Sequence, residues 1–380
     1  MRWLILTSST GTGHNMRADS LRQWAECVFG ASVEVRIHHV LEKTHPIYSL
    51  GVGLYNTIQR WCPRMHHLYF NYLELASLHR SSAKILGRDS FVKLVTEWAP
   101  DRIISVHPHT NHGFFDLARR ALPNRRTRCI TYCGELSGGY GLSRHWVNPR
   151  ADGFIGATDE ICAASRSVGM PEKRIFNGGF LLRSSFYGAE ARREREAEIM
   201  ARELGFERSV FTILLSSGLA GAHNHIEILR EIAALGHPLQ VVALCGHRAN
   251  TRRKVEAFAR KHPHLKVRAL AHTDRMLALK RLTSVVVARP GTGATSEAIQ
   301  LGVPLIHNGI GGVMPQELIT VRYCRIHACA YFGATAEEIV RHIRRMIQEP
   351  ATLNRLRKNL AAARPAGRPE QIVHWIHDCP

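Results

Sequence analysis

Three turns of small residues carry the groups of this sequence that could do chemistry, and each follows a short apolar run. The first is Ser8–His14, whose glycines leave the backbone free to approach a ligand closely. A helical pattern begins directly after this turn, and a helix N-terminus offers unpaired N–H groups to an anion. His14 stands where the turn meets the helix. A neutral imidazole there could accept a proton from a hydroxyl group, although a histidine that only fills the turn is the alternative.

A glycine-rich turn of this kind also occurs in proteins that bind nicotinamide dinucleotides. In those proteins an acidic residue ends the second strand and binds the ribose. Here the second apolar run ends in Ile37-His38-His39, with no acidic residue. The sequence therefore excludes a nicotinamide cofactor.

The second turn, Ser216–Ala222, suits a phosphate through its backbone N–H groups and the hydroxyls of its serines. The third turn, Arg289–Ala298, follows the apolar run Val285–Ala288. We expect a helix to start near Thr295, which puts Glu297 in the first turn. There the carboxylate could accept both hydroxyls of a ribose while the loop N–H groups face phosphate. The alternative is an acidic residue of ordinary capping value.

A further pair of polar residues, Gln316 and Glu317, follows the glycine-containing stretch Gly309–Gly312. Side by side after such a loop, the two side chains could hydrogen-bond sugar hydroxyls.

Short apolar runs alternate with segments of helical period almost throughout the chain, which predicts an α/β protein with parallel sheets. We expect strands at Trp3–Leu6, Val33–Ile37, Arg102–Val106, Cys129–Tyr132 and Gly153–Gly156 in the first half, and at Phe211–Leu215, Gln240–Leu244, Lys266–Leu270, Ser284–Ala288 and Pro304–His307 in the second. The charged run Gly188–Arg208 contains no strand signal and is expected to open the second domain as a helix. The predicted domains are therefore 1–185 and 186–364, followed by a helix in 365–380 that returns to the first domain.

The composition fits a globular chain of this size, because 380 residues suit two or three domains. Lysine and arginine number 51 against 31 acidic residues, a net charge of +20, and such a field attracts polyanions. Nucleic acid is not expected as a partner, because no zinc finger, aromatic RNA-binding signature or basic tail is present. An anionic membrane surface and phosphorylated small molecules remain candidate partners. The alternative is that the basic residues only form a well-solvated surface.

Several classes of protein and site are not expected. No apolar run approaches the ~18 residues needed to cross a bilayer, so no membrane span is expected. The first residues include too few apolar side chains for a signal peptide. Nine cysteines without a C-x-x-C pair predict reduced cytoplasmic thiols, and Cys324 and Cys329 are expected to be inert. His107, His109 and His112 have no carboxylate at ligand spacing, so we expect no metal site.

Residues Pro46–Trp98 form an aromatic-rich stretch of helical period with interspersed histidines and basic residues. Ordinary helical cover for a sheet is one interpretation. The other is a surface that docks on a membrane through Trp61, Tyr69 and Phe70, assisted by the basic charge.

Taken together, the first and third turns resemble those of the monogalactosyldiacylglycerol synthases and processive diacylglycerol glucosyltransferases, a family related to the UDP-GlcNAc transferase of lipid II synthesis. The similarity also covers Pro46–Trp98, the stretch Ala99–Pro108, and Gly178–Phe180. It implies a GT-B fold, in which two doubly wound Rossmann-like domains face each other across a cleft. It also implies an inverting transfer of a hexose from a UDP-sugar to a membrane lipid, with no metal or other cofactor, at the inner face of the cell membrane.

The resemblance further implies site residues. His14 would be the base, and Gly11 and Gly13 would shape its turn. The UDP-sugar would be bound by residues Ser217, Gly218, Gly246, Arg289, Gly291, Thr292, Gly293, Thr295 and Glu297, with Gln316 and Glu317 reaching the sugar.

The sequence departs from the diacylglycerol enzymes at Tyr132–Glu135, where they usually carry Thr-Asp. Glu135 resembles the pattern of the lipid II enzyme and becomes a second candidate base or acceptor ligand. Two alternatives therefore stay open. One is a UDP-GlcNAc-type transferase acting on a polyprenyl-linked or soluble acceptor, and the other is a catalytically lapsed protein that binds a nucleotide sugar.

Overall fold

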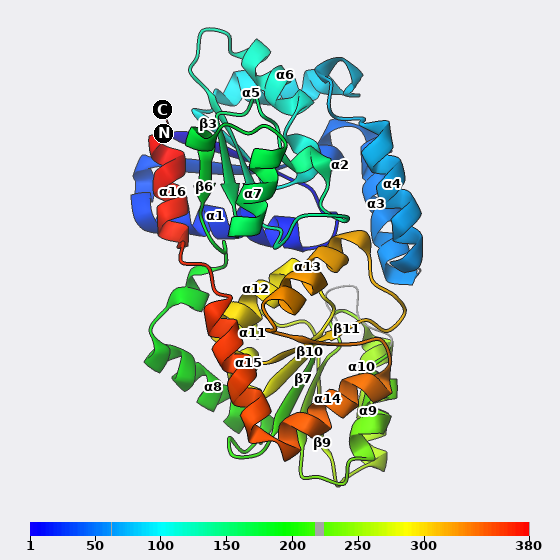
Figure 1. The fold of residues 1–380 in the computed structure, drawn as a ribbon. Coiled ribbons are helices and arrows are strands. Elements are labelled where there is room, and N and C mark those ends of the chain that lie inside the picture. The colour runs from blue at the N-terminus through cyan, green and yellow to red at the C-terminus, as the bar shows by residue number, and fades with distance from the viewer. Residues whose placement is uncertain (62, 217–223, 380) are drawn as a thin grey trace. The chain divides into compact units, whose positions relative to one another are not determined.

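The computed structural model describes residues 1–61, 63–216 and 224–379, and the chain divides into two compact units. Unit 1 comprises Met1–Ser184, Met314–Ile319 and Pro365–Pro380, and unit 2 comprises Ser185–Val313 and Thr320–Arg364. Each unit holds one parallel sheet with helices packed against it (Figure 1).

The sheet of unit 1 has six strands in the order β2-β1-β3-β4-β5-β6, and all neighbouring strands are parallel. Its strands are β1 (Arg2–Thr7), β2 (Glu34–His39), β3 (Arg102–Ser105), β4 (Arg128–Cys133), β5 (Gly153–Gly156) and β6 (Ile175–Asn177). The accompanying helices are α1 (Gly13–Phe29), α2 (Val40–Thr44), α3 (Pro46–Trp61), α4 (His66–Ala76), α5 (Arg88–Trp98), α6 (Gly113–Ala121), α7 (Asp159–Ser167) and α16 (Pro369–Asp378).

Unit 2 repeats this plan with the parallel order β12-β11-β10-β7-β8-β9. Its strands are β7 (Thr212–Ser216), β8 (Gln240–Leu244), β9 (Lys266–Leu270), β10 (Val285–Ala288), β11 (Leu305–Asn308) and β12 (Tyr331–Gly333). The helices are α8 (Glu190–Leu204), α9 (His225–Ala233), α10 (Ala249–Lys261), α11 (Met276–Leu282), α12 (Thr292–Leu301), α14 (Ala336–Gln348) and α15 (Pro350–Ala362). Helix α13 (Pro315–Ile326) begins in the segment assigned to unit 1 and ends in unit 2.

Each strand order contains one point where the direction of winding reverses. In unit 1 this point lies between β1 and β3, and in unit 2 it lies between β7 and β10. In open parallel sheets, ligands bind outside the carboxyl ends of the strands at such a point. The turns after β1, β7 and β10 are the three turns that the sequence analysis singled out.

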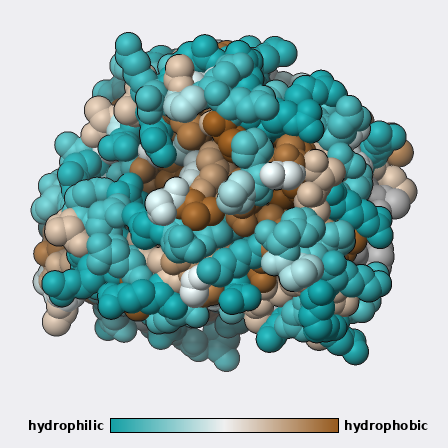
Figure 2. Space-filling view, turned by 90° about the horizontal axis from the view of Figure 1, so that it is seen from below, coloured by the Kyte–Doolittle hydropathy of each residue, from teal (hydrophilic) through white to brown (hydrophobic). Residues whose placement is uncertain are grey.

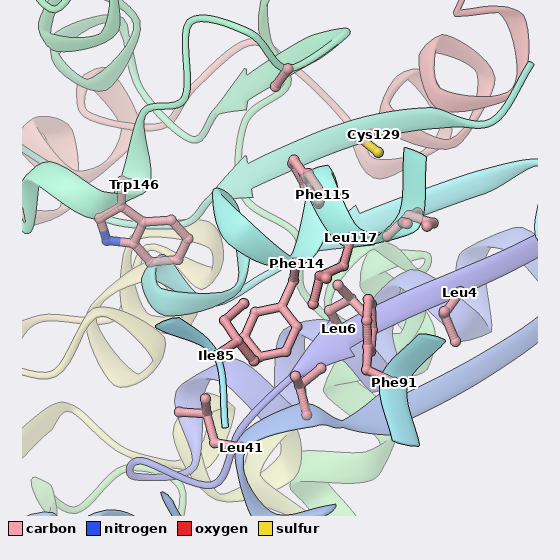
Figure 3. Close-up of a cluster of buried hydrophobic side chains, with 14 of the residues drawn as sticks. Leu4, Leu6, Leu41, Ile85, Phe91, Phe114, Phe115, Leu117, Cys129 and Trp146 are labelled. Carbon is pink, nitrogen blue, oxygen red and sulfur yellow. The ribbon is translucent and has the colours of Figure 1, made fainter. Parts of the chain in front are cut away.

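The central strands are buried on both faces, as expected for a parallel sheet covered by helices. In strand β1, every residue from Trp3 to Thr7 is buried. Leu4 and Leu6 point to one face of the sheet, where they join Phe91 of α5 and Phe114 of α6 in one apolar cluster (Figure 3). This cluster fixes β1 and therefore the start of the turn that carries His14.

The ten strands expected from the sequence are all present, and Gly153–Gly156, Gln240–Leu244 and Lys266–Leu270 have the expected bounds. The sequence analysis missed β6 and β12, which end their sheets. Each has only three residues, too few to show a period. The expected start of the helix near Thr295 is wrong, because α12 already begins at Thr292.

The C-terminal helix α16 packs within unit 1 against α1, and the two chain ends lie close together (Figure 1). Phe29 at the end of α1 stacks on His377 with 4.6 Å between ring centroids. The Arg102 guanidinium donates to three carbonyls at the end of the chain, those of Ile376, His377 and Cys379, at 2.7–3.0 Å.

Hydrophilic side chains cover most of the face seen in Figure 2. Many of the basic groups of the described residues form surface ion pairs, such as Arg125 with Asp101 at 2.6 Å. Among the described residues, no helix combines the length and the apolar character needed to cross a bilayer.

Candidate active site

His14 is the second residue of α1, and its side chain is only partly exposed. Its Nδ1 lies 2.8 Å from the carbonyl oxygen of Val106, which directly follows β3. A carbonyl only accepts, so Nδ1 carries the hydrogen and Nε2 is the proton-accepting nitrogen of the neutral ring. The rings of His107 and Trp146 pack against it, with centroid distances of 4.5 and 5.8 Å. The fold therefore fixes both the position and the tautomer of His14.

Arg17 lies one turn further along α1 and joins His14 to the second candidate base. Its guanidinium donates to the carbonyl of Gly134 at 2.7 Å and lies 3.6 Å from a carboxylate oxygen of Glu135, just after β4. A side chain at Gly134 would collide with the Arg17 guanidinium, so this approach requires glycine. Arg17 and Glu135 are both buried. His14, Arg17 and Glu135 thus form one cluster at the carboxyl ends of the strands.

The pKa values of the two candidate bases are shifted in opposite directions. Enclosure by the protein, and secondly the charge of Arg17, lower the pKa of His14 to about 3. Burial raises the pKa of Glu135 above its ordinary value, although Arg17 opposes that rise. The low pKa of His14 could not be foreseen from the sequence, because its main cause is the enclosure of the ring in the fold. His14 is the more exposed of the two groups. The raised pKa of Glu135 makes its carboxylate a stronger base than that of an ordinary glutamate.

Side chains from α2 and α3 hold the turn between β1 and α1. Glu42 accepts from the N–H of Ser9 at 2.5 Å, and Asn56 accepts from the N–H of Gly11 at 3.0 Å. Gly11 has a φ of 71°, a conformation that suits glycine. Two of the N–H groups expected to face an anion are therefore already hydrogen-bonded within unit 1. A Cβ at Gly13 would meet no atom within 4 Å, so the space beside the start of α1 is open.

In unit 2, β7 and β10, the strands that precede the second and third turns, are neighbours at the reversal point. Ser216 ends β7 and pairs in register with Ala288 at the end of β10. Ser217 and Gly218 lie outside the described residues. Gly246 follows the neighbouring strand β8 with a φ of 58°. The structure thus gathers Ser216, Gly246 and the turn at Arg289 at one edge of the sheet.

The turn after β10 leads directly into α12. Gly291 is the N-cap residue, and Thr292 is the first residue of the helix. At both Gly291 and Gly293 a Cβ would meet no atom within 4 Å, so this helix N-terminus adjoins open space. The Arg289 guanidinium donates to the carbonyl of Ile310 at 3.2 Å. Backbone N–H groups beside open space suit an anion such as a phosphate.

Glu297 lies in the second turn of α12 and is 5% exposed. Its expected place in the first turn, outside the core, is therefore wrong, because the helix starts three residues earlier than predicted. One carboxylate oxygen lies 2.6 Å from the ammonium of Lys280 on α11. Thr295, two residues before Glu297, is fully buried, and its hydroxyl is 3.1 Å from Nε2 of His307. Glu297 and Thr295 thus lie beneath the open helix end.

The segment that carries Gln316 and Glu317 belongs to unit 1. The amide nitrogen of Gln316 donates to the hydroxyl of Tyr55 at 2.5 Å, and its amide oxygen is buried without a partner among the described residues. Glu317 accepts from the N–H of Met314 at 2.9 Å, which caps the start of α13. Part of the hydrogen-bonding capacity of Glu317 is therefore used by its own helix.

Histidine rings form a chain in unit 1 that leads away from His14. The centroid distances are 4.5 Å from His14 to His107, 5.6 Å from His107 to His109, and 5.0 Å from His109 to His145. Among the described residues, no three His, Cys, Asp or Glu side chains are arranged to hold a metal ion. His107 instead acts locally. Its Nδ1 accepts from the N–H of His109, so its Nε2–H donates to the Thr10 hydroxyl at 2.8 Å.

Comparisons with known proteins agree with this geometry. Residues 14–180 match the family model of monogalactosyldiacylglycerol (MGDG) synthase. The processive diacylglycerol β-glucosyltransferase of Bacillus subtilis is 22% identical over 397 residues, which cover 99% of this chain and 94% of that protein. This chain is related to the MGDG synthase and processive diacylglycerol glucosyltransferase family. The family predicted from the sequence is thereby confirmed.

Solved structures show the same fold. MurG of Acinetobacter baumannii matches with a TM-score of 0.61 at 12% identity, over 99% of both chains. HepE of Anabaena, in complex with UDP-glucose, matches with a TM-score of 0.55 at 13% identity, over 100% of this chain and 98% of that one. The predicted GT-B fold is confirmed.

Sequence reasoning about this relative of the MGDG synthases missed the residues that connect the site. Arg17 follows His14 by three positions, a spacing that puts both on one helix face, so helical periodicity could have indicated it. Asn56 binds Gly11 from 45 positions away in the sequence, and Lys280 binds Glu297 from 17 positions away. Only the fold brings these pairs together, and no signal in the sequence marks them.

Proposed function

We propose that this chain transfers a hexose from a UDP-sugar to a diacylglycerol-type lipid with inversion at the anomeric carbon. The observation that carries the proposal is the helix N-terminus of α12, which adjoins open space at Gly291 and Gly293 at the reversal point of the unit 2 sheet. A doubly wound sheet binds a nucleotide at this place. The diacylglycerol glucosyltransferase that matches nearly the whole chain supports the lipid acceptor.

The donor is assigned to unit 2. The start of α12 at Gly291, Thr292 and Gly293 is assigned to the diphosphate through the positive end of the helix dipole, and Arg289 adds positive charge. Glu297 accepts from the ribose hydroxyls, and Thr295 of the same helix is assigned to the lining of the nucleotide site. Ser217, Gly218 and Gly246, after β7 and β8, complete the nucleotide site. Gln316 and Glu317 are assigned to the hexose, and the unpartnered amide oxygen of Gln316 supports that assignment.

Proton removal is assigned to unit 1. Nε2 of His14 takes the proton of the acceptor hydroxyl, because Nδ1 donates to Val106 and the ring is the more exposed of the two candidate bases. Glu135 is assigned to hold Arg17, and it remains the alternative base because its pKa is raised. Gly11 and Gly13 give the turn the shape that presents His14.

The lipid acceptor calls for a membrane-facing surface, and we assign it to α3 and α4. Two apolar stripes are exposed there, Ile47, Leu50 and Leu54 on α3 and Leu68, Tyr72 and Leu75 on α4, at 51–79% exposure. Arg64, Arg80 and Lys84 are exposed nearby, and basic residues bind anionic lipid at about 1 kcal/mol each. The enzyme is therefore proposed to work as a peripheral protein on the inner face of the cell membrane. Nucleic acid is not proposed as a partner.

The stripes differ from the residues expected to dock. Tyr69 and Phe70 are partly buried, and the Tyr69 hydroxyl donates to the carbonyl of Gly51 between the two helices. The side chain of Trp61 lies outside the described part of the chain. The docking proposal therefore rests on the leucines.

The test is a screen of UDP-glucose, UDP-galactose and UDP-GlcNAc against diacylglycerol, a polyprenyl phosphate and soluble sugars, with mass analysis of the products. We expect a hexosyl-diacylglycerol. A product formed only on the polyprenyl or soluble acceptor would favour a UDP-GlcNAc-type transferase. UDP binding by calorimetry without turnover on any acceptor would identify a lapsed, nucleotide-sensing protein.

A further inference from the structure

Lys280 of α11 is enclosed completely, with only 1% of its side chain exposed. Its ammonium contacts two parts of α12. It lies 2.6 Å from the carboxylate of Glu297, and it donates to the carbonyl of Ala294, in the first turn, at 3.0 Å. One lysine therefore holds both the candidate ribose ligand and the helix turn beside the candidate phosphate site.

Stability is a poor explanation for this buried ion pair. Two charges lose their hydration in the interior, and their mutual attraction often fails to compensate, so apolar residues of similar size would serve the fold as well or better. The neighbours of Lys280 on α11, Leu277, Leu279 and Leu282, are apolar and buried, which shows that this part of unit 2 accommodates an apolar core. The charge at Lys280 calls for another reason.

We propose that Lys280 is a positioning residue for the ribose of the donor. By binding one carboxylate oxygen it fixes the rotamer of Glu297, so that the other oxygen is aimed at the ribose hydroxyls. Through Ala294 the same ammonium ties that carboxylate to the first turn of α12, which sets the spacing between ribose and phosphate. The inference rests on the nucleotide site assigned above.

The experiment compares the affinity of UDP with that of 2′-deoxy-UDP by calorimetry, in the wild-type protein and in Lys280→Met. Hydrogen bonds to a charged group predict that the wild type prefers UDP by about tenfold or more. In Lys280→Met we expect this preference to fall to about threefold or less, because the carboxylate is no longer aimed. If Lys280 were merely structural, its replacement would weaken the binding of both ligands equally and leave the ratio of their affinities unchanged.

Arg281→Gln is the matched control. Arg281 is the next residue of α11, is largely buried, pairs with Glu190 and Glu194 of α8, and donates to the carbonyl of Leu301 at the end of α12, so its loss disturbs the same helix without touching Glu297. We expect it to keep the preference of the wild type. If Lys280→Met does not fold, Lys280→Gln replaces it, because its amide can still donate, and we expect an intermediate ratio.

The outcomes separate the two proposals. A full preference for UDP in a folded Lys280 variant would overturn the positioning role and leave the nucleotide site intact. A wild-type protein that binds UDP and 2′-deoxy-UDP equally would overturn the ribose role of Glu297, and the role of Lys280 with it.

Discussion

The chemistry of unit 1 depends on three side chains within one cluster, and Arg17 is the residue that connects them. Its charge lowers the pKa of His14 and at the same time opposes the rise in the pKa of Glu135. A neutral His14 is ready to accept a proton throughout the physiological range, because its pKa of about 3 lies far below pH 7. The same low value makes it a weak base, so its position must contribute most of its effect.

Replacing the proposed base should affect turnover and leave nucleotide binding unchanged. We expect His14→Ala to lower kcat by about 10²–10⁴-fold, the usual contribution of a general base, with the affinity for UDP nearly unaltered because unit 2 binds the nucleotide. Steady-state kinetics and calorimetry with UDP measure the two quantities.

Glu135→Gln is the comparison. The amide keeps the shape of the side chain, so a residue that only holds Arg17 should retain more activity than His14→Ala leaves. The opposite ranking, with an active His14→Ala and an inactive Glu135→Gln, would transfer the role of base to Glu135.

At the scale of the element, the apolar stripes of α3 and α4 are the feature that a globular protein in water would not need. The two helices run side by side (Figure 1) and each exposes apolar side chains on successive turns. Large contiguous apolar patches on a surface indicate contact with a membrane or a protein. The basic residues beside the stripes favour an anionic membrane.

The triple substitution Leu50→Ser, Leu68→Ser and Leu75→Ser should weaken binding to anionic lipid vesicles by at least about tenfold. Each leucine contributes roughly 1.5–3 kcal/mol when fully buried. All three are more than 70% exposed, so the variant should fold normally. Vesicle sedimentation over a range of salt concentrations measures the effect, and the remaining binding should fall as salt rises. Ile326→Ser, an exposed substitution in unit 2, is the control. Equal binding by the wild type and the triple variant would refute the docking surface.

The sequence was most informative about the secondary-structure elements. The ten strands expected from apolar runs all exist, because a strand buried on both faces needs a continuous run that is visible in one dimension. His14, Glu297 and the three turns followed from the same reasoning, since glycines and polar residues after such runs mark the carboxyl ends of strands. The burial of Glu297 was not foreseen, because it depends on Lys280, which approaches from another helix. Partners that are distant in sequence, including Asn56 and Arg102, were invisible for the same reason.

For the whole molecule, the buried histidines make stability depend on pH. Burial lowers the pKa of both His79 and His112 to about 4, whereas in the unfolded chain each titrates near 6.5. Between these values the unfolded state binds more protons, so the free energy of unfolding should fall as the pH drops from about 6.5 to about 4. The slope is at most about 1.4 kcal/mol per pH unit for each such histidine.

His79→Phe tests this source of the slope. His79 contacts the rings of Tyr48 and Phe114, and its Nε2 is buried without a partner among the described residues, so phenylalanine keeps the packing and removes the titration. Urea unfolding at several pH values between 4 and 7 should give a smaller slope for this variant. Slopes identical to those of the wild type would exclude His79 as a contributor.

The C-terminal helix is expected to be essential to unit 1. Deletion of residues 365–380 removes Ile372, Val373 and Ile376, which are fully buried, at roughly 1.5–3 kcal/mol for each. It also deprives Arg102 of three carbonyl acceptors. We expect unit 1 to unfold at a lower urea concentration, while Asp378→Asn, an exposed change in the same helix, should behave like the wild type. An unchanged transition in the deletion variant would contradict the packing described for α16.

The return of α16 to unit 1 also governs how the protein is made. When Ser184 has been synthesised, the segment 314–319 and the helix that cover unit 1 do not yet exist. At about 5–20 residues per second, the rest of the chain takes on the order of 10–40 s. Throughout that time the nascent N-terminal half displays Phe29 and the face of α1 that α16 later covers. The N-terminal half of unit 1 therefore completes its fold only after α16 has been made, and until then it exposes an apolar surface of the kind that chaperones bind.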